Sequence, residues 1–309
     1  MIITKNTERK NKMAWRTVLI ENPAKLSLKD NKLVIKQEHE IHVPLEDIDT
    51  LVLDSGAINL TQKLLGALGR FTANVVICDE KHLPTSMITP YSHGSRGAKI
   101  ARTQLSISMP LKKQLWQKNI TRKIMNQAMV LKKHGHTYED LIELSKTVRS
   151  GDVSNNEATA ARLYFERLLQ DSTRRQPTWY NSALDYGYAI VRSEIARTVA
   201  ARGLIAAVGI NHHSELNQYN LVDDLIETLR PLVDDYVLTA VAVRHVDAHM
   251  DDILTREDRH LLIDIINQYG IILDKKYKIR DVVNIMVDSF IEAINQDSIL
   301  PFQLPELIK

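Results

Sequence analysis

The N-terminal part of the chain alternates short apolar segments with turn residues. Apolar or alternating segments lie at 15–20, 25–28, 33–36, 41–43, 49–53, 75–78 and 85–89. Turn residues such as Asp30 and Asn31 separate them, and short runs bounded in this way are typical of β-strands. One helix is expected at 61–71, with Thr61 as its N-cap. The pattern predicts a small β-sandwich-like domain with one helix at 13–92, preceded by a flexible extension at 1–12.

From residue 98 onward the apolar positions follow a helical period. The expected helices are 98–133, 137–149, 153–170, 182–202, 221–250, 256–267 and 279–295. Pro110 must kink or restart the first of them because proline removes a helix hydrogen bond, and Gly203 is a natural C-cap. A polar linker at 93–97 separates this all-α domain, 98–309, from the β domain. We therefore expect an α+β fold with two domains.

Composition excludes several classes of protein. The chain has 309 residues, of which 44% are hydrophobic and 25% charged, as in globular proteins. No apolar run approaches the roughly 20 residues of a membrane span, and the polar N-terminus has no secretory signal pattern. The single cysteine, Cys78, allows no internal disulfide and is expected in the core. We expect a cytoplasmic protein with no membrane partner.

Positive charge is concentrated in one segment, from Arg96 to Tyr138, which contains no Asp or Glu. Its cations are Arg96, Lys99, Arg102, Lys112, Lys113, Lys118, Arg122, Lys123, Lys132 and Lys133. Cations without interleaved acids favour a surface that binds nucleic-acid phosphates, and the first eight are the candidate DNA contacts. The alternative is a solvated helix face.

The segment GINHHSELNQYNLVDDLIETLR, residues 209–230, combines a histidine pair with a following acidic helix. Asp224 and Glu227 are three residues apart, which places both carboxylates on one helical face. Such oxygens with one imidazole are suitable ligands for a hard divalent cation. The alternative is that these acids only stabilise the start of the helix through its dipole.

Glu157 also has two interpretations. With Ser154 as N-cap it would be the third helical residue of a capping box, which explains it without any further role. The other interpretation is a metal ligand on a buried face.

Three motifs together resemble the CRISPR-associated integrases, the larger and catalytic subunit of the machinery that inserts new spacers. They are Glu157 in NNEATAARLYF, the G-x-x-H loop from Gly209 to His212, and DLIETLRP from Asp224 to Pro231. Segments at 13–16, 104–118 and 181–197 extend the resemblance over nearly the whole chain, and its character is that of type II systems. Ala158 stands where the family commonly has glycine, and His213 adds a second imidazole that leaves the register of the loop open by one residue.

The resemblance implies a metal-dependent endonuclease and integrase that joins spacer 3′-hydroxyl ends into a CRISPR array by transesterification. It implies Mg²⁺ or Mn²⁺ bound by Glu157, His212 and Glu227, with Asp224, Arg230 and His213 around these ligands. Double-stranded DNA, both spacer precursor and CRISPR repeat, is the implied substrate. The implied assembly is a homodimer formed through the β domain, joined to a small dimeric companion in a heterohexamer.

Two other functions remain open from the residues alone. A metal-dependent phosphoesterase for small substrates would share the acids and histidine but would not need the cationic segment. A non-catalytic DNA-binding scaffold would keep the cations, and its glutamates would only cap helices. A further cluster, His245, Asp247, His249, Asp251 and Asp252, is expected to be a solvated helix face.

Overall fold

The structure is a computed structural model that describes residues 2–3, 16–80, 84–90, 97–169, 173–244 and 253–307. Its N-terminal part contains a five-stranded sheet in the order β1-β2-β6-β8-β9. The strands are β1 (Ile2–Ile3), β2 (Arg16–Ile20), β6 (Ile48–Leu53), β8 (Asn74–Cys78) and β9 (Pro84–Ile88). β2, β6 and β8 are parallel, whereas β1 and β9 are antiparallel edges.

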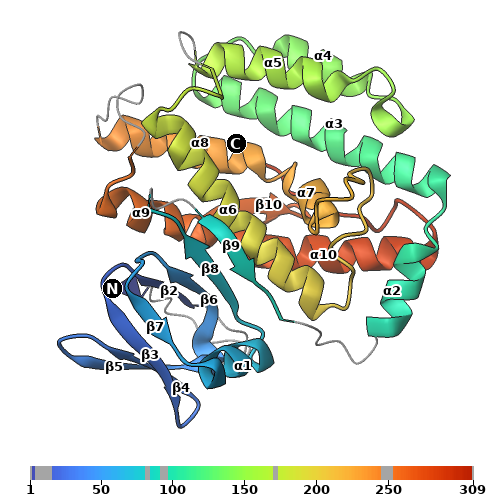
Figure 1. Cartoon of the computed structure of the whole chain (residues 1–309). Helices are drawn as coiled ribbons and strands as arrows, with labels where there is room; N and C mark the ends of the chain where they lie inside the picture. The colour runs from blue at the N-terminus through green and yellow to red at the C-terminus, as the bar shows by residue number, and fades with distance from the viewer. Residues whose placement is uncertain are drawn as a thin grey trace.

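A second sheet of four strands, in the order β5-β4-β3-β7, packs against the first (Figure 1). Its strands are β3 (Ala24–Lys29), β4 (Lys32–Lys36), β5 (Glu40–Pro44) and β7 (Ile58–Leu60), and a 3₁₀ turn (Leu45–Asp47) follows β5. Helix α1 (Gln62–Arg70) closes the sandwich, and the Thr61 side chain accepts from the Leu64 amide as its N-cap. The N-terminal part thus consists of strands and one helix, as the sequence predicts. Strands β1 and β7 were not predicted, and β1 lies within the expected extension.

The parallel centre of the five-stranded sheet, formed by β2, β6 and β8, is buried on both faces, as expected for parallel strands. Val18, Leu51 and Val75 are register neighbours and belong to the core between the two sheets. Their successors Leu19, Val52 and Val76 point the other way and join the core of the helical part. One sheet therefore contributes to both hydrophobic cores.

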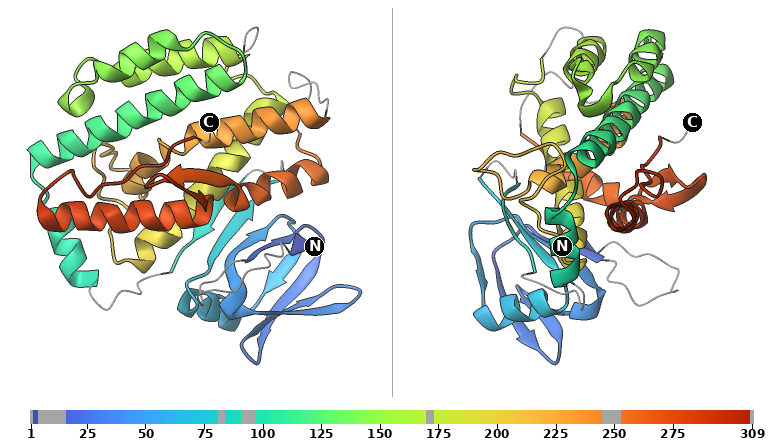
Figure 2. Two further views of the ribbon diagram at one scale, coloured as in Figure 1. Left: turned by 180° about the vertical axis from the view of Figure 1, so that it is seen from behind. Right: turned by 90° about the vertical axis from the view of Figure 1, so that its right-hand side faces the viewer.

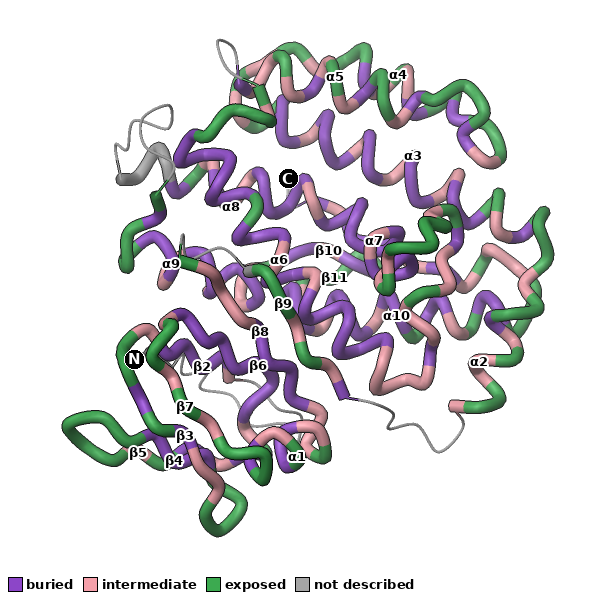
Figure 3. Tube along the Cα trace, in the orientation of Figure 1, coloured by how far each residue is buried: buried purple, intermediate pink, exposed green. Residues whose placement is uncertain are grey.

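The remaining chain is mainly helical, and Figure 2 shows its helices layered beside the sandwich. The helices are α2 (Gly97–Leu105), α3 (Met109–Lys133), α4 (Glu139–Lys146), α5 (Asn156–Leu169), α6 (Trp179–Ala201), α7 (Asn220–Ile226), α8 (Arg230–Arg244), α9 (Arg256–Ile263) and α10 (Ile279–Gln296), with 3₁₀ turns at Ser150–Asp152 and Asp264–Asn267. Helix α6 is buried along most of its length, whereas α4 and α5 form an outer, partly exposed layer above α3 (Figure 3). No helix in the described part of the chain is long and apolar enough to cross a membrane.

The helix predictions hold for most of this region, with two corrections. The chain restarts at Pro110, which lies in the first turn of α3, as expected. The predicted helix 221–250 is wrong because the chain leaves helical structure between α7 and α8. The prediction of an all-α second domain is also wrong, since β10 (Tyr269–Ile272) and β11 (Lys275–Lys278) form an antiparallel hairpin.

Candidate functional site

Helix α3 carries a row of polar side chains on its buried face. Asn119, Lys123 and Asn126 are buried and lie at helical spacing. Asn119 Nδ2 donates to the Asp224 carbonyl at 2.6 Å, and Asn126 Nδ2 donates to the Thr228 carbonyl at 2.9 Å. These bonds satisfy carbonyls at the break between α7 and α8, which would otherwise be buried without partners.

Lys123 joins the two predicted glutamate ligands. Its Nζ lies 2.7 Å from Glu157 Oε1 and also contacts Glu227 Oε2. Burial alone would lower the pKa of Lys123, but the charges of Glu227 and Glu157 raise it. Burial would likewise raise the pKa of Glu227, yet Lys123 and Arg230 lower it to about 2. Both charged forms are therefore stabilised at neutral pH, and the two acids share one ammonium group.

The side chain of Glu157 is free for this contact because another acid caps α5. Asp152 accepts hydrogen bonds from the amides of Asn156 and Glu157, at 2.9 and 3.0 Å. The predicted cap at Ser154 is wrong, since Ser154 is exposed and precedes Asn155, whose φ is 52°. The capping-box interpretation of Glu157 fails with it, because the Glu157 carboxylate turns toward α3.

The loop that follows α6 is closed around Asp224, which is fully buried. Its carboxylate accepts hydrogen bonds from the amides of Ile210, Asn211 and His212. A Cβ on Gly209 would lie 2.3 Å from the His212 carbonyl oxygen and 2.6 Å from Asp224 Oδ2. Only glycine allows this close approach, which gives the first position of the G-x-x-H motif its physical reason.

His212 is the oriented histidine of the pair. Its Nδ1 lies 2.7 Å from Asp224 Oδ1, and its ring meets Trp116 edge to face, with centroids 5.7 Å apart. The hydrogen bond to Asp224 raises the pKa of His212, and the charges of Glu227 and Glu157 act in the same direction. His213 is exposed and its Nδ1 contacts the Asn211 carbonyl oxygen at 2.8 Å. Because Nδ1 of His212 is held, its Nε2 remains for a ligand.

Glu227 follows the last residue of α7 and lies at the break between α7 and α8. Pro231 lies in the first turn of α8. Proline lacks an amide hydrogen and cannot continue a helix from α7, which accounts for the break. Glu227 is buried, and Arg230 Nε donates to its Oε1 at 3.0 Å. This contact makes Arg230 a charge partner of Glu227. Arg230 also lies over the Tyr188 ring, 4.7 Å from its centroid.

The predicted DNA-binding cations fall into three groups. Lys99, Arg102 and Lys113 are exposed and Lys112 is half-buried, with no ion-pair partner among the described residues. Lys118 donates to the carbonyls of Ile299 and Phe302, and Arg122 pairs with Glu306 at 2.8 Å. Lys123 is buried between two glutamates, so its assignment to an open DNA surface is wrong. Arg96 and the cluster from His245 to Asp252 lie outside the described residues.

The donor set of this site fits a divalent cation, although the side chains of the described residues are not gathered closely enough to bind one directly. The carboxylates of Glu157 and Glu227 already share the Lys123 ammonium group. The His212 imidazole beside them is held by the Asp224 carboxylate, as is usual for metal-binding histidines. Oxygen and imidazole donors suit Mg²⁺ or Mn²⁺.

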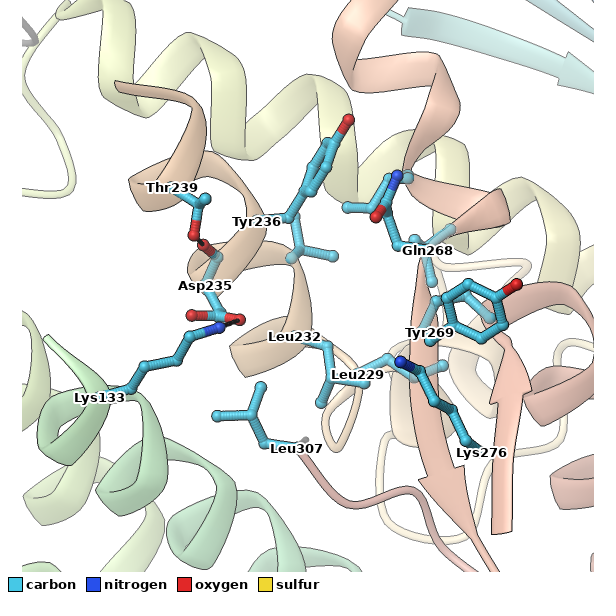
Figure 4. Close-up of a pocket in the computed structure, with 14 residues that line it drawn as sticks. Lys133, Leu229, Leu232, Asp235, Tyr236, Thr239, Gln268, Tyr269, Lys276 and Leu307 are labelled. Carbon is cyan, nitrogen blue, oxygen red and sulfur yellow. Dashed lines mark hydrogen bonds and ion pairs between the residues drawn. The ribbon is translucent and has the colours of Figure 1, made fainter. Parts of the chain in front are cut away.

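A cavity in the described part of the chain lies away from these residues. It has a volume of about 310 Å³ and lies between α8, the β10–β11 hairpin and the end of α3. Figure 4 shows Lys133 and Asp235 at one side of it and Tyr269 and Lys276 at the other. None of the predicted ligands, Glu157, His212 and Glu227, lines this cavity.

Three residues of the site were not predicted from the sequence. Asn119 holds the Asp224 carbonyl, and Asp152 caps the start of α5. Trp116 packs against the His212 ring. A signal existed for one of them, because Asn119 lies on the apolar face of α3 with Leu115, where a polar side chain needs a partner. Asp152 and Trp116 have no such signal in the sequence.

Comparison with known proteins gives one consistent family. A family model described as CRISPR associated protein Cas1 matches residues 17–264. The CRISPR-associated endonuclease Cas1 of Neisseria meningitidis serogroup C (strain 8013) is 38% identical over 301 residues, which cover 96% of this chain and 97% of that protein. The CRISPR-associated endonuclease Cas1 of Mycobacterium tuberculosis (strain ATCC 25618 / H37Rv) is 25% identical over 254 residues, covering 74% of each.

Solved structures share the fold at low sequence identity. A casposase bound to integration product has a TM-score of 0.75 at 16% identity, over 92% of this chain and 91% of that one. A CAS1 protein from Thermotoga maritima also has a TM-score of 0.75, at 14% identity, over 90% and 96%. A chain of a Cas6-RT-Cas1–Cas2 complex has a TM-score of 0.80 at 18% identity, over 99% of this chain and 37% of that one.

Proposed function

The chain belongs to the Cas1 family of CRISPR-associated proteins, and from this premise we propose that it is a metal-dependent DNA endonuclease and integrase. It joins the 3′-hydroxyl ends of spacer DNA to a CRISPR repeat by transesterification. The observation that carries the proposal is the single ammonium group shared by Glu157 and Glu227, which come from different helices, beside a histidine oriented by Asp224.

In this proposal Glu157, His212 and Glu227 hold Mg²⁺ or Mn²⁺. Such an ion polarises the target phosphodiester and stabilises the attacking and leaving oxygens. The protein's own part is orientation. Asp224 fixes the His212 ring, and Arg230 keeps the buried Glu227 ionised by lying against its carboxylate.

The DNA duplex is held mainly through its phosphates by the open cations of α2 and α3. Lys99, Arg102, Lys112 and Lys113 are the described side chains available for this role, because no ion pair engages them. Phosphate contacts position a duplex without reading its sequence. His213, exposed beside His212, is placed to assist them.

The proposed assembly is a homodimer formed through the β domain, which binds a small dimeric companion to give a heterohexamer in the cytoplasm. Support comes from the fold, which is shared with a chain of a Cas6-RT-Cas1–Cas2 complex. Light scattering of the protein alone and with its companion tests this: a monomer that stays monomeric with the companion would contradict it.

A strand-transfer assay with Mn²⁺ and a branched or duplex DNA substrate tests the function. Glu157→Ala, Glu227→Ala and His212→Ala are expected to abolish joining while duplex binding is nearly unchanged. His213→Ala is expected to lower joining about tenfold or less, which corresponds to about 1.4 kcal/mol.

The same assay separates the competing functions. A scaffold would bind DNA but show no metal-dependent cleavage or joining in the unchanged protein. A small-substrate phosphoesterase would hydrolyse a phosphate monoester and be insensitive to loss of Lys112 and Lys113. Full joining in His212→Ala with none in His213→Ala would move the histidine ligand by one residue.

A further inference from the structure

Lys123 is enclosed by the two acids that the proposed function assigns to the metal. It is 7% exposed, and its ammonium group contacts one oxygen of Glu157 and one of Glu227. The other oxygen of Glu227 accepts from Arg230 Nε at 3.0 Å. Both oxygens of Glu227 therefore already face a positive charge.

The charges at this point are balanced before any metal arrives. Glu157 and Glu227 supply two negative charges, and Lys123 and Arg230 supply two positive ones. The nearby carboxylate of Asp224 is occupied by three amides and by His212. A divalent cation that entered between Glu157 and Glu227 would place further positive charge beside Lys123 and Arg230, which is unfavourable.

Two changes can restore the balance. The Lys123 ammonium group can withdraw from the carboxylates, or an anion can enter with the metal. The substrate supplies such an anion in each phosphodiester, and the open cation Lys112 lies about three turns before Lys123 on the same side of α3. Metal and DNA phosphate would then stabilise each other's binding, as linkage requires.

We propose that Lys123 is an internal competitor of the divalent cation, so that the metal binds weakly to the free protein and tightly only together with DNA. This inference rests on the proposed metal-dependent function. Lys123 is a positioning residue in this scheme. It keeps Glu157 and Glu227 ionised and prevents cations from the solvent from binding to them until DNA is present. Its role differs from that of a phosphate contact, which its burial rules out.

The competition is measured by titrating Mn²⁺ into the protein and following free Mn²⁺ by electron paramagnetic resonance, without DNA. Lys123→Gln keeps a hydrogen-bond donor but removes the charge. We expect it to bind Mn²⁺ at least about tenfold more tightly than the unchanged protein, since one unit charge at contact distance is worth more than that. Lys132→Gln is the matched control, because Lys132 is exposed, on the same helix and about 13 Å further along its axis. The Mn²⁺ affinity of Lys132→Gln should stay within about twofold of that of the unchanged protein.

A second measurement needs no variant and therefore does not depend on Lys123→Gln folding. Mn²⁺ affinity of the unchanged protein is compared with and without a duplex whose 3′ ends are dideoxy, so that no 3′-hydroxyl can attack. We expect the duplex to raise Mn²⁺ affinity about tenfold or more, within the usual range of coupling between sites. In Lys123→Gln the same duplex should raise it much less.

The outcomes discriminate between the hypotheses. Weaker or unchanged Mn²⁺ binding in Lys123→Gln, or equal affinity with and without duplex in the unchanged protein, would overturn the competition while leaving the metal site intact. Glu227→Gln is the reference for the site itself. If the unchanged protein and Lys123→Gln bound Mn²⁺ no better than Glu227→Gln does, the proposed metal site would fail, and the role of Lys123 with it.

Discussion

A single buried carboxylate, Asp224, determines where the His212 ring lies. Spacing alone suggested that Asp224 and Glu227 share one helical face and one ion, but their contacts differ. Asp224 turns to the preceding loop, whereas Glu227 turns to Lys123 on α3. The difference arises because the chain leaves helical structure after Ile226 and because the loop folds back onto α7. Neither event can be deduced from a spacing of three residues.

Asp224→Asn is predicted to be severe although it changes only one atom. An amide nitrogen cannot accept the hydrogen bonds that one carboxylate oxygen now accepts, so loop amides lose their partners. We expect a loss on the order of 2–3 kcal/mol in the free energy of unfolding and at least about a hundredfold loss of strand transfer. Denaturant unfolding and the strand-transfer assay measure the two effects.

Asp223→Asn is the control for this prediction. Asp223 is the adjacent acid, and it pairs with Arg192 and accepts a hydrogen bond from Asn217 instead of from the amides of residues 210–212. It should retain strand transfer within about threefold. Equal losses of activity in both variants would contradict the role given to Asp224.

Lys123 shows what a charge pattern can and cannot predict. In a segment of ten cations without an acid, all of them resemble phosphate contacts. Helical spacing places Lys123 three and four residues from Ile120 and Asn119, which are buried, and this was the available signal that it is enclosed. Its two partners, Glu157 and Glu227, come from other parts of the chain, so the charge pattern of this segment could not identify them.

At the scale of elements, the end of α6 is fitted closely to the start of α2. Gly203 has a φ of 77°, and a Cβ there would lie 2.4 Å from the Gly97 Cα. Gly203→Ala should therefore cost about 3 kcal/mol or more of stability, since the clash adds to the left-handed backbone. Thermal and denaturant unfolding measure this loss.

Gly135 offers a matched comparison for Gly203. Its φ is 78°, but nothing lies within 4 Å of the position of its Cβ. Gly135→Ala should cost only about 1 kcal/mol, which comes from the backbone conformation alone. Equal stability of the two variants would contradict the prediction that the close approach of Gly97 makes Gly203→Ala more destabilising than Gly135→Ala.

The cations of α2 and α3 are expected to differ in their effect on DNA binding. Replacing Lys112 and Lys113 by Gln should reduce the slope of log affinity against log salt by about 0.9 for each phosphate that is no longer neutralised. Replacing Lys118 and Arg122 by Gln should change the slope less, because protein carbonyls and Glu306 already engage them. Fluorescence anisotropy over a salt series decides between them, and equal changes of slope would contradict the distinction.

Two hairpins show why one turn was predictable and the other was not. The β3–β4 turn has positive φ at Asp30 and Asn31, residues that tolerate this conformation and mark turns. The β10–β11 turn has positive φ at Leu273 and Asp274, and leucine gives no such signal. The break between α7 and α8, by contrast, has a signal in the sequence, because Pro231 is suited to the first turn of a new helix.

At the scale of the whole molecule, ion pairs join the sandwich to the helices. Glu21 and Asp54, which follow β2 and β6, are held by α9: His260 contacts Glu21 at 2.8 Å and Arg259 contacts Asp54 at 2.6 Å. Asp49 of β6 pairs with Arg280 of α10 at 2.8 Å. The carboxyl ends of β2 and β6 thus meet cations of α9, and the amino end of β6 meets a cation of α10. The fold class was predictable, but these pairings between distant segments were not.

Glu21 makes a definite prediction for stability against pH. Burial raises its pKa, but hydrogen bonds from His260 and Arg256 lower it below the usual value. A lowered pKa in the folded state contributes stability above the ordinary glutamate pKa of about 4.3, and this contribution is lost as pH falls through the folded value. Glu21→Gln should destabilise the protein at pH 7 by an amount on the order of 3 kcal/mol and flatten the decline in acid.

Urea unfolding between pH 3 and 7 measures both effects. Glu40→Gln is the control, because Glu40 is an exposed acid whose pKa is also lowered, by His42 and Lys36, but at the sandwich surface. It should leave stability at pH 7 nearly unchanged. An unchanged acid decline in Glu21→Gln would place the pH sensitivity in other carboxylates.

The sheet shared by the two cores has a consequence for inheritance. Adjacent residues such as Leu51 and Val52 belong to different cores, so a mutation in a strand can have its compensating partner in a distant helix. A recombination that exchanged the strands alone would pack the helix-facing side of the five-stranded sheet against helices from another protein. Those helices would not have evolved together with this sheet. The strands and helices should therefore descend together, and viable natural chimeras should have their crossovers in the exposed hairpins at the outer sheet.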